Sequence, residues 1–108
     1  MDTFYHYRDT RHPVIAQWRE ATPKDEFARF LVTISSIDAE HYIGNSAPTP
    51  ILFQSARYDI GVSERESQEF FEAAAEPKEL KWYDTGHMIN DPRAVADRAA
   101  WLRKHLEF

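Results

Sequence analysis

The sequence predicts a small α/β protein with a minimal two-stranded parallel sheet flanked by about five helices. Three observations indicate this class. A length of 108 residues supports a single domain, residues 1–108. A hydrophobic fraction of 43% is typical of a folded globular chain. Two short apolar runs, at residues 51–54 and 80–83, alternate with two helix-like segments, which is the order of a right-handed βαβα unit.

The first 46 residues are expected to form a helical segment that precedes this unit. Residues 10–20 predict a short helix with Pro13 in its first turn. Thr22 then predicts the start of a second helix, because a Thr followed by proline is a common N-cap pattern. Residues 38–43 predict one or two further turns that end at Gly44. The second helix carries an apolar stripe at helical spacing, which consists of Phe27, Phe30, Leu31 and Ile34.

Residues 47–108 are expected to form the βαβα unit itself. The continuous apolar run of the first strand is typical of a parallel strand buried on both faces. Ser63 and Glu66 have the spacing of a capping box, which predicts a helix through about residue 75 with Pro77 ending it. The apolar side chains that this helix is expected to bury are Phe70, Phe71 and Ala74.

The last helix is predicted to begin at Asp91 and Pro92, after the second strand. Arg103, Lys104 and His105 fall in its final turn, where the helix dipole favours cations. Its buried face is expected to carry Val95, Ala99, Leu102 and Leu106.

Composition excludes several function classes. A formal net charge of −5 disfavours nucleic acid and anionic membranes as partners, since both require a basic surface. There is no cysteine, and therefore neither a disulfide nor a thiolate nucleophile. No apolar run could span a bilayer and the start does not resemble a signal peptide, so we expect a cytoplasmic protein. No cofactor or metal is expected, because no metal-ligand spacing occurs among His6, His12, His41 and His105.

One acid and one histidine follow the two predicted strands. Asp59 lies in the turn after the first strand and His87 in the turn after the second. In α/β proteins chemistry collects at the carboxyl ends of parallel strands, so both side chains are expected at one edge of the sheet. A carboxylate beside an imidazole fixes its tautomer and stabilises the imidazolium, and Gly86 could allow the turn that aims the ring. Asp84 is an alternative acid, although its position directly after the second strand better fits a residue that ends the strand.

These two segments resemble those of bacterial α/β-hydrolases of the dienelactone hydrolase and esterase kind. Residues 50–59, with the sequence Pro-Ile-Leu-Phe and then Arg-Tyr-Asp, resemble the strand and catalytic acid. Residues 83–87, Tyr-Asp-Thr-Gly-His, resemble the catalytic-histidine segment, and the helix with Asp97, Arg98, Trp101 and Leu102 resembles the last helix. The resemblance implies a partial α/β-hydrolase fold in which Asp59 is the acid, His87 the general base and residues 13–45 a helical insertion.

The chain departs from that family in one large respect. It has no Gly-x-Ser-x-Gly elbow, because Gly44, Gly61 and Gly86 are its only glycines and no serine lies between any pair of them at that spacing. Ser55 and Ser63 lie near Asp59, but neither is at a strand-to-helix elbow. The resemblance implies that the elbow strands lie before Met1, and that this is the acid- and histidine-bearing half of an ester or acyl hydrolase, inactive alone.

Two alternatives remain open: a non-catalytic interaction module that binds through an exposed sheet edge, and the complementing half of a split hydrolase. In either case we expect a homodimer or a complex with the other half, since a two-stranded sheet leaves an apolar edge unpaired. The aromatic start, residues 4–8, is expected to serve packing or an interface.

Overall fold

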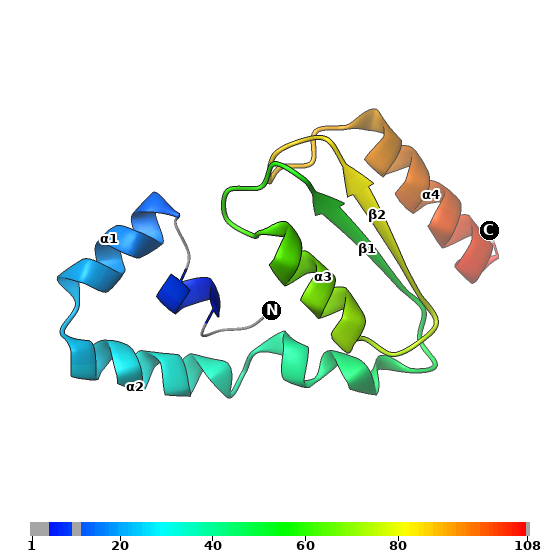
Figure 1. Ribbon diagram of the computed structural model, residues 1–108. Helices are drawn as coiled ribbons and strands as arrows, with labels where there is room; N and C mark the ends of the chain where they lie inside the picture. The colour runs from blue at the N-terminus through cyan, green and yellow to red at the C-terminus, as the bar shows by residue number, and fades with distance from the viewer. Residues whose placement is uncertain (1–4, 10–11, 108) are drawn as a thin grey trace.

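The computed structural model describes residues 5–9 and 12–107. The chain begins with a π-helical turn, Tyr5–Asp9, followed by helices α1 (Pro13–Ala21) and α2 (Lys24–Ser35). Two 3-10 turns, Ala39–His41 and Ile43–Ser46, lead to the sheet. Strand β1 (Ile51–Ala56), helix α3 (Glu64–Ala73), strand β2 (Lys78–Tyr83) and helix α4 (Pro92–Leu106) follow in that order. Figure 1 shows this sequence of elements.

The two strands pair in parallel, which confirms the predicted small α/β fold. Ile51 is opposite Lys78 at the start of the ladder and Ala56 is opposite Tyr83 at its end. The strands are therefore in register over their whole length, and both end at the same edge of the sheet. Each strand is longer than its predicted run, because backbone pairing also includes polar residues such as Ser55 and Lys78.

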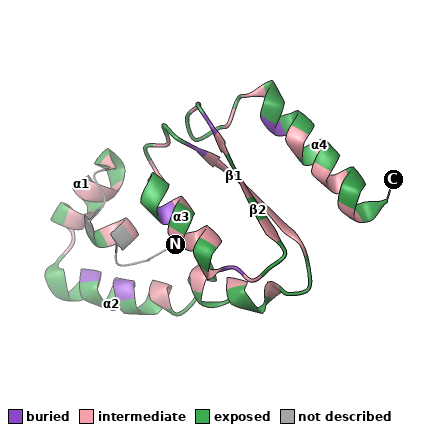
Figure 2. Cartoon of the chain, turned by 45° about the vertical axis from the view of Figure 1, so that its right-hand side comes forward, coloured by how far each residue is buried: buried purple, intermediate pink, exposed green. Residues whose placement is uncertain are grey.

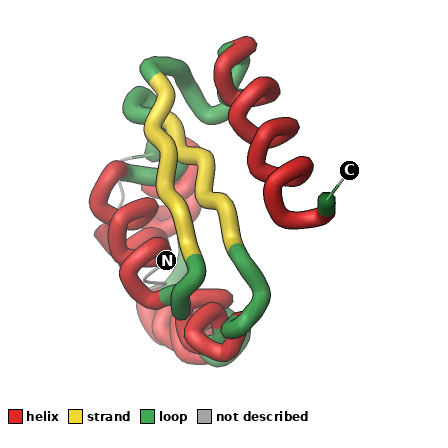
Figure 3. Tube along the Cα trace, turned by 90° about the vertical axis from the view of Figure 1, so that its right-hand side faces the viewer, coloured by secondary structure: helices red, strands yellow, loops and turns green. Residues whose placement is uncertain are grey.

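Helices cover both faces of the sheet, as Figure 3 shows. On one face Phe53 packs edge-on against Phe70 and Phe71 of α3, with ring centroids 5.4 and 5.5 Å apart. On the other face Gln54 donates to the carbonyl oxygen of Ala94 in α4. Successive side chains of β1 thus contact different helices, as the alternation of a strand requires.

The first helices form a separate aromatic cluster. We call Tyr5–Asp9, α1 and α2 together the helical arm; it lies on the α3 side of the sheet, away from α4 (Figures 1 and 3). Tyr7, Trp18 and Phe30 pack ring against ring, with centroids between 4.8 and 6.5 Å apart. The packing role expected for the aromatic start thus holds for Tyr7, while Phe4 lies outside the described residues.

Four predicted helix boundaries change. Thr22 does not cap α2; it follows α1, and its hydroxyl donates back to the carbonyl oxygen of Trp18, while Pro23 precedes α2 without a side-chain cap. Gly44 lies inside the second 3-10 turn and does not end the segment. Helix α3 ends at Ala73, four residues before Pro77. Helix α1 begins at Pro13, and Thr10 and Arg11 lie outside the described residues.

The expected buried face of α4 is only partly right: Ala99 and Leu102 are half-buried, whereas the other two residues are not. Val95 and Leu106 are exposed, and Ala94 is the buried residue of this helix. Figure 2 shows the outward side of α4 as largely exposed. The helix is turned so that Ala94 and Asp97 approach the sheet, where they bond to Gln54 and Tyr83. Among the described residues no helix is both long enough and apolar enough to cross a membrane.

Candidate acid–base site at the sheet edge

Two loops leave the same edge of the sheet and run side by side. We call residues 57–63 the acid loop and residues 84–91 the histidine loop. The amide of Arg57 donates to the carbonyl oxygen of Tyr83 at 2.9 Å, and the amide of Tyr58 donates to that of Thr85 at 3.1 Å. The parallel ladder therefore extends past both strands, which brings residues 28 positions apart in sequence into one site.

Asp59 and His87 are hydrogen-bonded to each other at this edge. His87 Nδ1 lies 2.8 Å from Asp59 Oδ2. The other carboxylate oxygen, Oδ1, accepts the amides of Gly61 at 2.8 Å and Val62 at 3.0 Å. The side chain of Asp59 is only 10% exposed whereas that of His87 is 66% exposed, so the acid is embedded and the ring faces outward.

The surroundings of Asp59 favour its charged form. Burial alone would raise the pKa of the carboxyl, but the hydrogen bonds from His87, Gly61 and Val62 outweigh it and leave the pKa below its usual value. The acid is therefore a carboxylate at neutral pH. A carboxylate can only accept, so Nδ1 of His87 must carry the proton that it donates.

This assignment determines the chemistry that His87 can perform. When the ring is neutral and Nδ1 bears the proton, Nε2 carries a lone pair. Nε2 has no hydrogen-bond partner within residues 5–9 and 12–107. The arrangement is thus an oriented base whose conjugate acid would be stabilised by the adjacent Asp59 carboxylate.

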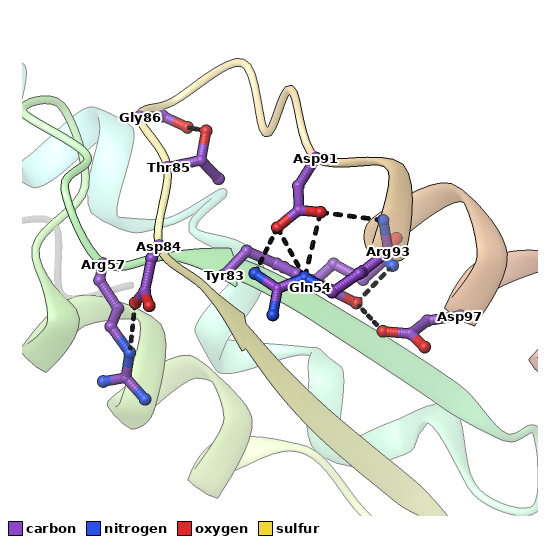
Figure 4. Close-up of polar contacts among 9 residues, drawn as sticks. All are labelled: Gln54, Arg57, Tyr83, Asp84, Thr85, Gly86, Asp91, Arg93 and Asp97. Atoms are coloured by element: carbon purple, nitrogen blue, oxygen red, sulfur yellow. Dashed lines mark hydrogen bonds and ion pairs between the residues drawn. The ribbon is translucent and has the colours of Figure 1, made fainter.

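Asp84, the alternative acid, faces another partner. Its Oδ1 lies 3.2 Å from Nε of Arg57, as Figure 4 shows. Arg57 in turn lies over the ring of Trp82, with 5.4 Å between the guanidinium carbon and the ring centroid. Asp84 directly follows β2 and is exposed, in agreement with its interpretation as a residue that terminates the strand.

The turn that contains His87 has a different geometry from the one expected. Gly86 does not have a positive φ, so its conformational freedom is not what aims the ring. The left-handed residue is Ile89, with φ 48°, and its amide closes the turn by donating to the carbonyl oxygen of Gly86. A β-branched residue in this region is strained, which indicates that the surrounding loop imposes the conformation.

The candidate serines do not reach His87. Ser55 lies within β1, and Ser63 caps α3, its hydroxyl accepting the amide of Glu66. No hydroxyl group in the described part of the chain is hydrogen-bonded to His87. The other histidines are dispersed; His105, for example, packs against Trp101. No group of three or more metal-ligand side chains occurs among the described residues.

Two polar clusters were not anticipated. Gln54 Nε2 donates to the Tyr83 hydroxyl, and that hydroxyl donates to Asp97 at 2.7 Å, which ties α4 to both strands (Figure 4). Burial and the bond to Asp97 raise the pKa of Tyr83. The second cluster is a buried pair, in which His6 Nδ1 lies 2.8 Å from Oε1 of Glu66. The capping-box spacing predicted the position of Glu66, but no signal in the sequence connects it to residue 6.

Large apolar residues flank Asp59 and His87 in the sequence, and their side chains are open to solvent. Tyr58 and Ile60, on either side of Asp59, are 68% and 76% exposed, and Met88 is 78% exposed. We call these three residues the apolar rim. Their position beside the only embedded acid–histidine pair of the two loops makes this edge a candidate binding surface.

Comparison with protein-family models, with curated proteins and with solved structures found no match to this chain. The function of the pair is therefore inferred from its own geometry and chemistry.

Proposed function

We propose that this chain supplies the acid and the general base of an α/β-hydrolase-type active site, and that a hydroxyl nucleophile comes from a polypeptide segment outside it. The observation that carries the proposal is the bond between the embedded Asp59 carboxylate and Nδ1 of a ring whose Nε2 is open. In nucleophile–acid–histidine sites the same arrangement activates a serine.

In the proposed reaction His87 Nε2 takes the proton of the nucleophile as it attacks an ester or related acyl carbon. The ring then becomes an imidazolium held by Asp59, whose low pKa keeps it ionised throughout. Nε2 next returns the proton to the leaving group. Water repeats the sequence on the acyl intermediate, and no cofactor is required.

The apolar rim supports an external source for the nucleophile. Tyr58 and Ile60 are the sequence neighbours of Asp59, Met88 follows His87, and all three side chains are largely exposed. A segment with a strand-to-helix serine elbow would cover that surface while presenting its hydroxyl to Nε2. Excluding water there would also strengthen the interaction between Asp59 and the imidazolium.

The test is reconstitution with a polypeptide that carries the Gly-x-Ser-x-Gly strand and helix of a bacterial α/β-hydrolase. The expected result is stoichiometric fluorophosphonate labelling of the elbow serine and saturable ester hydrolysis, both dependent on this chain. Surface histidines cleave activated esters slowly, so His87→Ala sets the background. Equal rates for the wild type and His87→Ala in an active mixture would contradict the proposal.

A second candidate is a non-catalytic interaction module. The observation in its favour is that the described sheet has only two strands, so each strand has one edge without a partner within the described residues. In that case the chain would bind through an edge and the apolar rim, and replacing Asp59 would leave partner affinity unchanged.

A further inference from the structure

Glu66 is a deeply buried carboxylate for which the proposed reaction has no direct use. Its side chain is 3% exposed, and it is the buried charged residue among the described ones. Charges are rarely buried without compensating bonds, because removing a charged group from water costs roughly several kcal/mol. The bonds that compensate Glu66 therefore indicate what it holds in place.

The first of these bonds goes to the acid loop. Glu66 Oε2 accepts the amide of Ser63 at 2.8 Å, while the amide of Glu66 donates to the Ser63 hydroxyl. The two preceding amides, of Gly61 and Val62, donate to Asp59. Two carboxylates thus bind three consecutive amides, and the end of the loop opposite Asp59 is fixed by Glu66.

The second bond goes to the helical arm. His6 Nδ1 lies 2.8 Å from Glu66 Oε1, and the His6 side chain is only 12% exposed. His6 is followed by Tyr7, which packs on Phe30 and whose carbonyl oxygen accepts a bond from Arg19. The arm is therefore connected to the acid loop through His6 and Glu66.

We propose that Glu66 and His6 are positioning residues for Asp59, through which docking of the helical arm fixes the acid loop. Glu66 orients the Ser63 amide, the adjoining amides of Gly61 and Val62 then converge on Asp59, and the carboxylate meets Nδ1 of His87. The functional meaning rests on the role proposed for Asp59, but the coupling itself is a property of this chain and is measurable without enzymatic activity.

Amide hydrogen exchange at Gly61 and Val62, measured by NMR on the whole chain, tests the coupling. His6→Ala should accelerate exchange at both amides on the order of tenfold, which corresponds to about 1.4 kcal/mol. The Nδ1 proton resonance of His87 should move upfield as its bond to Asp59 loosens. His6→Asn should restore both signals, because an Asn side-chain amide nitrogen branches from Cγ as Nδ1 does.

Two further variants complete the design. Glu66→Gln retains the size of the side chain and should give an intermediate effect, while Glu69→Gln, an acid of the same helix that pairs with Arg65, should have none. A folded His6→Ala variant with unchanged Gly61 and Val62 exchange would overturn the inference. Loss of protection that is equal in the acid loop and in α4 would overturn it too, because the pair would then support the whole fold. Failure of reconstituted hydrolysis would leave these rates unaffected and would count only against the proposed function.

Discussion

Asp59 combines local and distant hydrogen bonds in a single side chain. The bonds from Gly61 and Val62 arise within the acid loop, whereas the bond from His87 crosses from the second strand. The local bonds hold the carboxylate still, and the distant one aligns the imidazole. An acid that only terminated a turn would need the first kind alone.

The lowered pKa of Asp59 predicts how stability depends on pH. A carboxyl whose pKa is lower in the folded than in the unfolded state contributes stability above its unfolded pKa, near 3.8, and this contribution is lost as pH falls through the folded value. Asp59→Asn should therefore lose stability at pH 7 and show a smaller decrease between pH 7 and pH 3 than the wild type. Urea unfolding at both pH values measures this, with Asp84→Asn as the control for removal of one nearby charge.

Asp59 and His87 should act as a unit in any active assembly. Replacing either should reduce kcat by about 10³- to 10⁴-fold, and the double variant should be little worse than the single ones. Asp84→Asn should change kcat little, because Asp84 bonds to Arg57. Kinetics of the wild type and these four variants decide the matter. Additive losses would show two independent surface residues, and a severe Asp84→Asn effect would identify Asp84 as the acid.

At the scale of elements, α4 is joined to the sheet by polar bonds as well as by packing. Tyr83→Phe removes the hydroxyl that links Gln54 and Asp97 and should lower the free energy of unfolding by about 1 kcal/mol. Tyr58→Phe makes the same chemical change on an exposed ring and should shift it by less than about 0.5 kcal/mol. Urea denaturation compares the two; equal effects would mean that the Tyr83 network contributes nothing.

The elements with strong local signals are those that the sequence predicted well. The capping box of Ser63 and Glu66 and the Asp91–Pro92 start of α4 depend on neighbouring residues, and both are confirmed. The apolar stripe of α2 is partly confirmed, with Phe27 and Leu31 buried. Parallel pairing then placed Asp59 and His87 at one edge, because both strands end in register.

The features that were missed depend on tertiary contacts. Thr22 has the composition of an N-cap, yet the end of α1 competes for its hydroxyl. Periodicity alone offered a stripe through Val95 and Leu106, whereas the polar bonds of Gln54 and Tyr83 turn Ala94 toward the sheet. The pairing of His6 with Glu66 spans 60 residues without any local pattern.

At the scale of the whole molecule, the chain is extended for its size. Its accessible surface is 7343 Å², whereas a compact monomer of 12.7 kDa exposes about 6,200 Å². Its radius of gyration is 16.2 Å, compared with about 13 Å for a compact domain of this length. The surplus of about 1,100 Å² exceeds the roughly 800 Å² that each partner buries in an interface of standard size.

We therefore predict self-association in the absence of another partner. In the described part of the chain one edge of β1 has no strand partner. This edge and the exposed apolar side chains favour pairing with a second copy, for which a two-fold axis is the simplest arrangement. Sedimentation equilibrium at micromolar concentration should give about twice the 12.7 kDa chain mass. A single monomeric species with a cooperative melt would show that this edge needs no partner.

The central claim is that Asp59 holds the proton of His87 on Nδ1 and leaves Nε2 as the base. The most direct measurement is the tautomer of His87, from long-range ¹H–¹⁵N NMR correlations at about pH 9, where imidazoles are neutral. The predicted result is a protonated Nδ1 with a downfield proton and an unprotonated Nε2, with the downfield proton lost in Asp59→Asn. A neutral ring protonated on Nε2, or a spectrum that Asp59→Asn leaves unchanged, would contradict the claim.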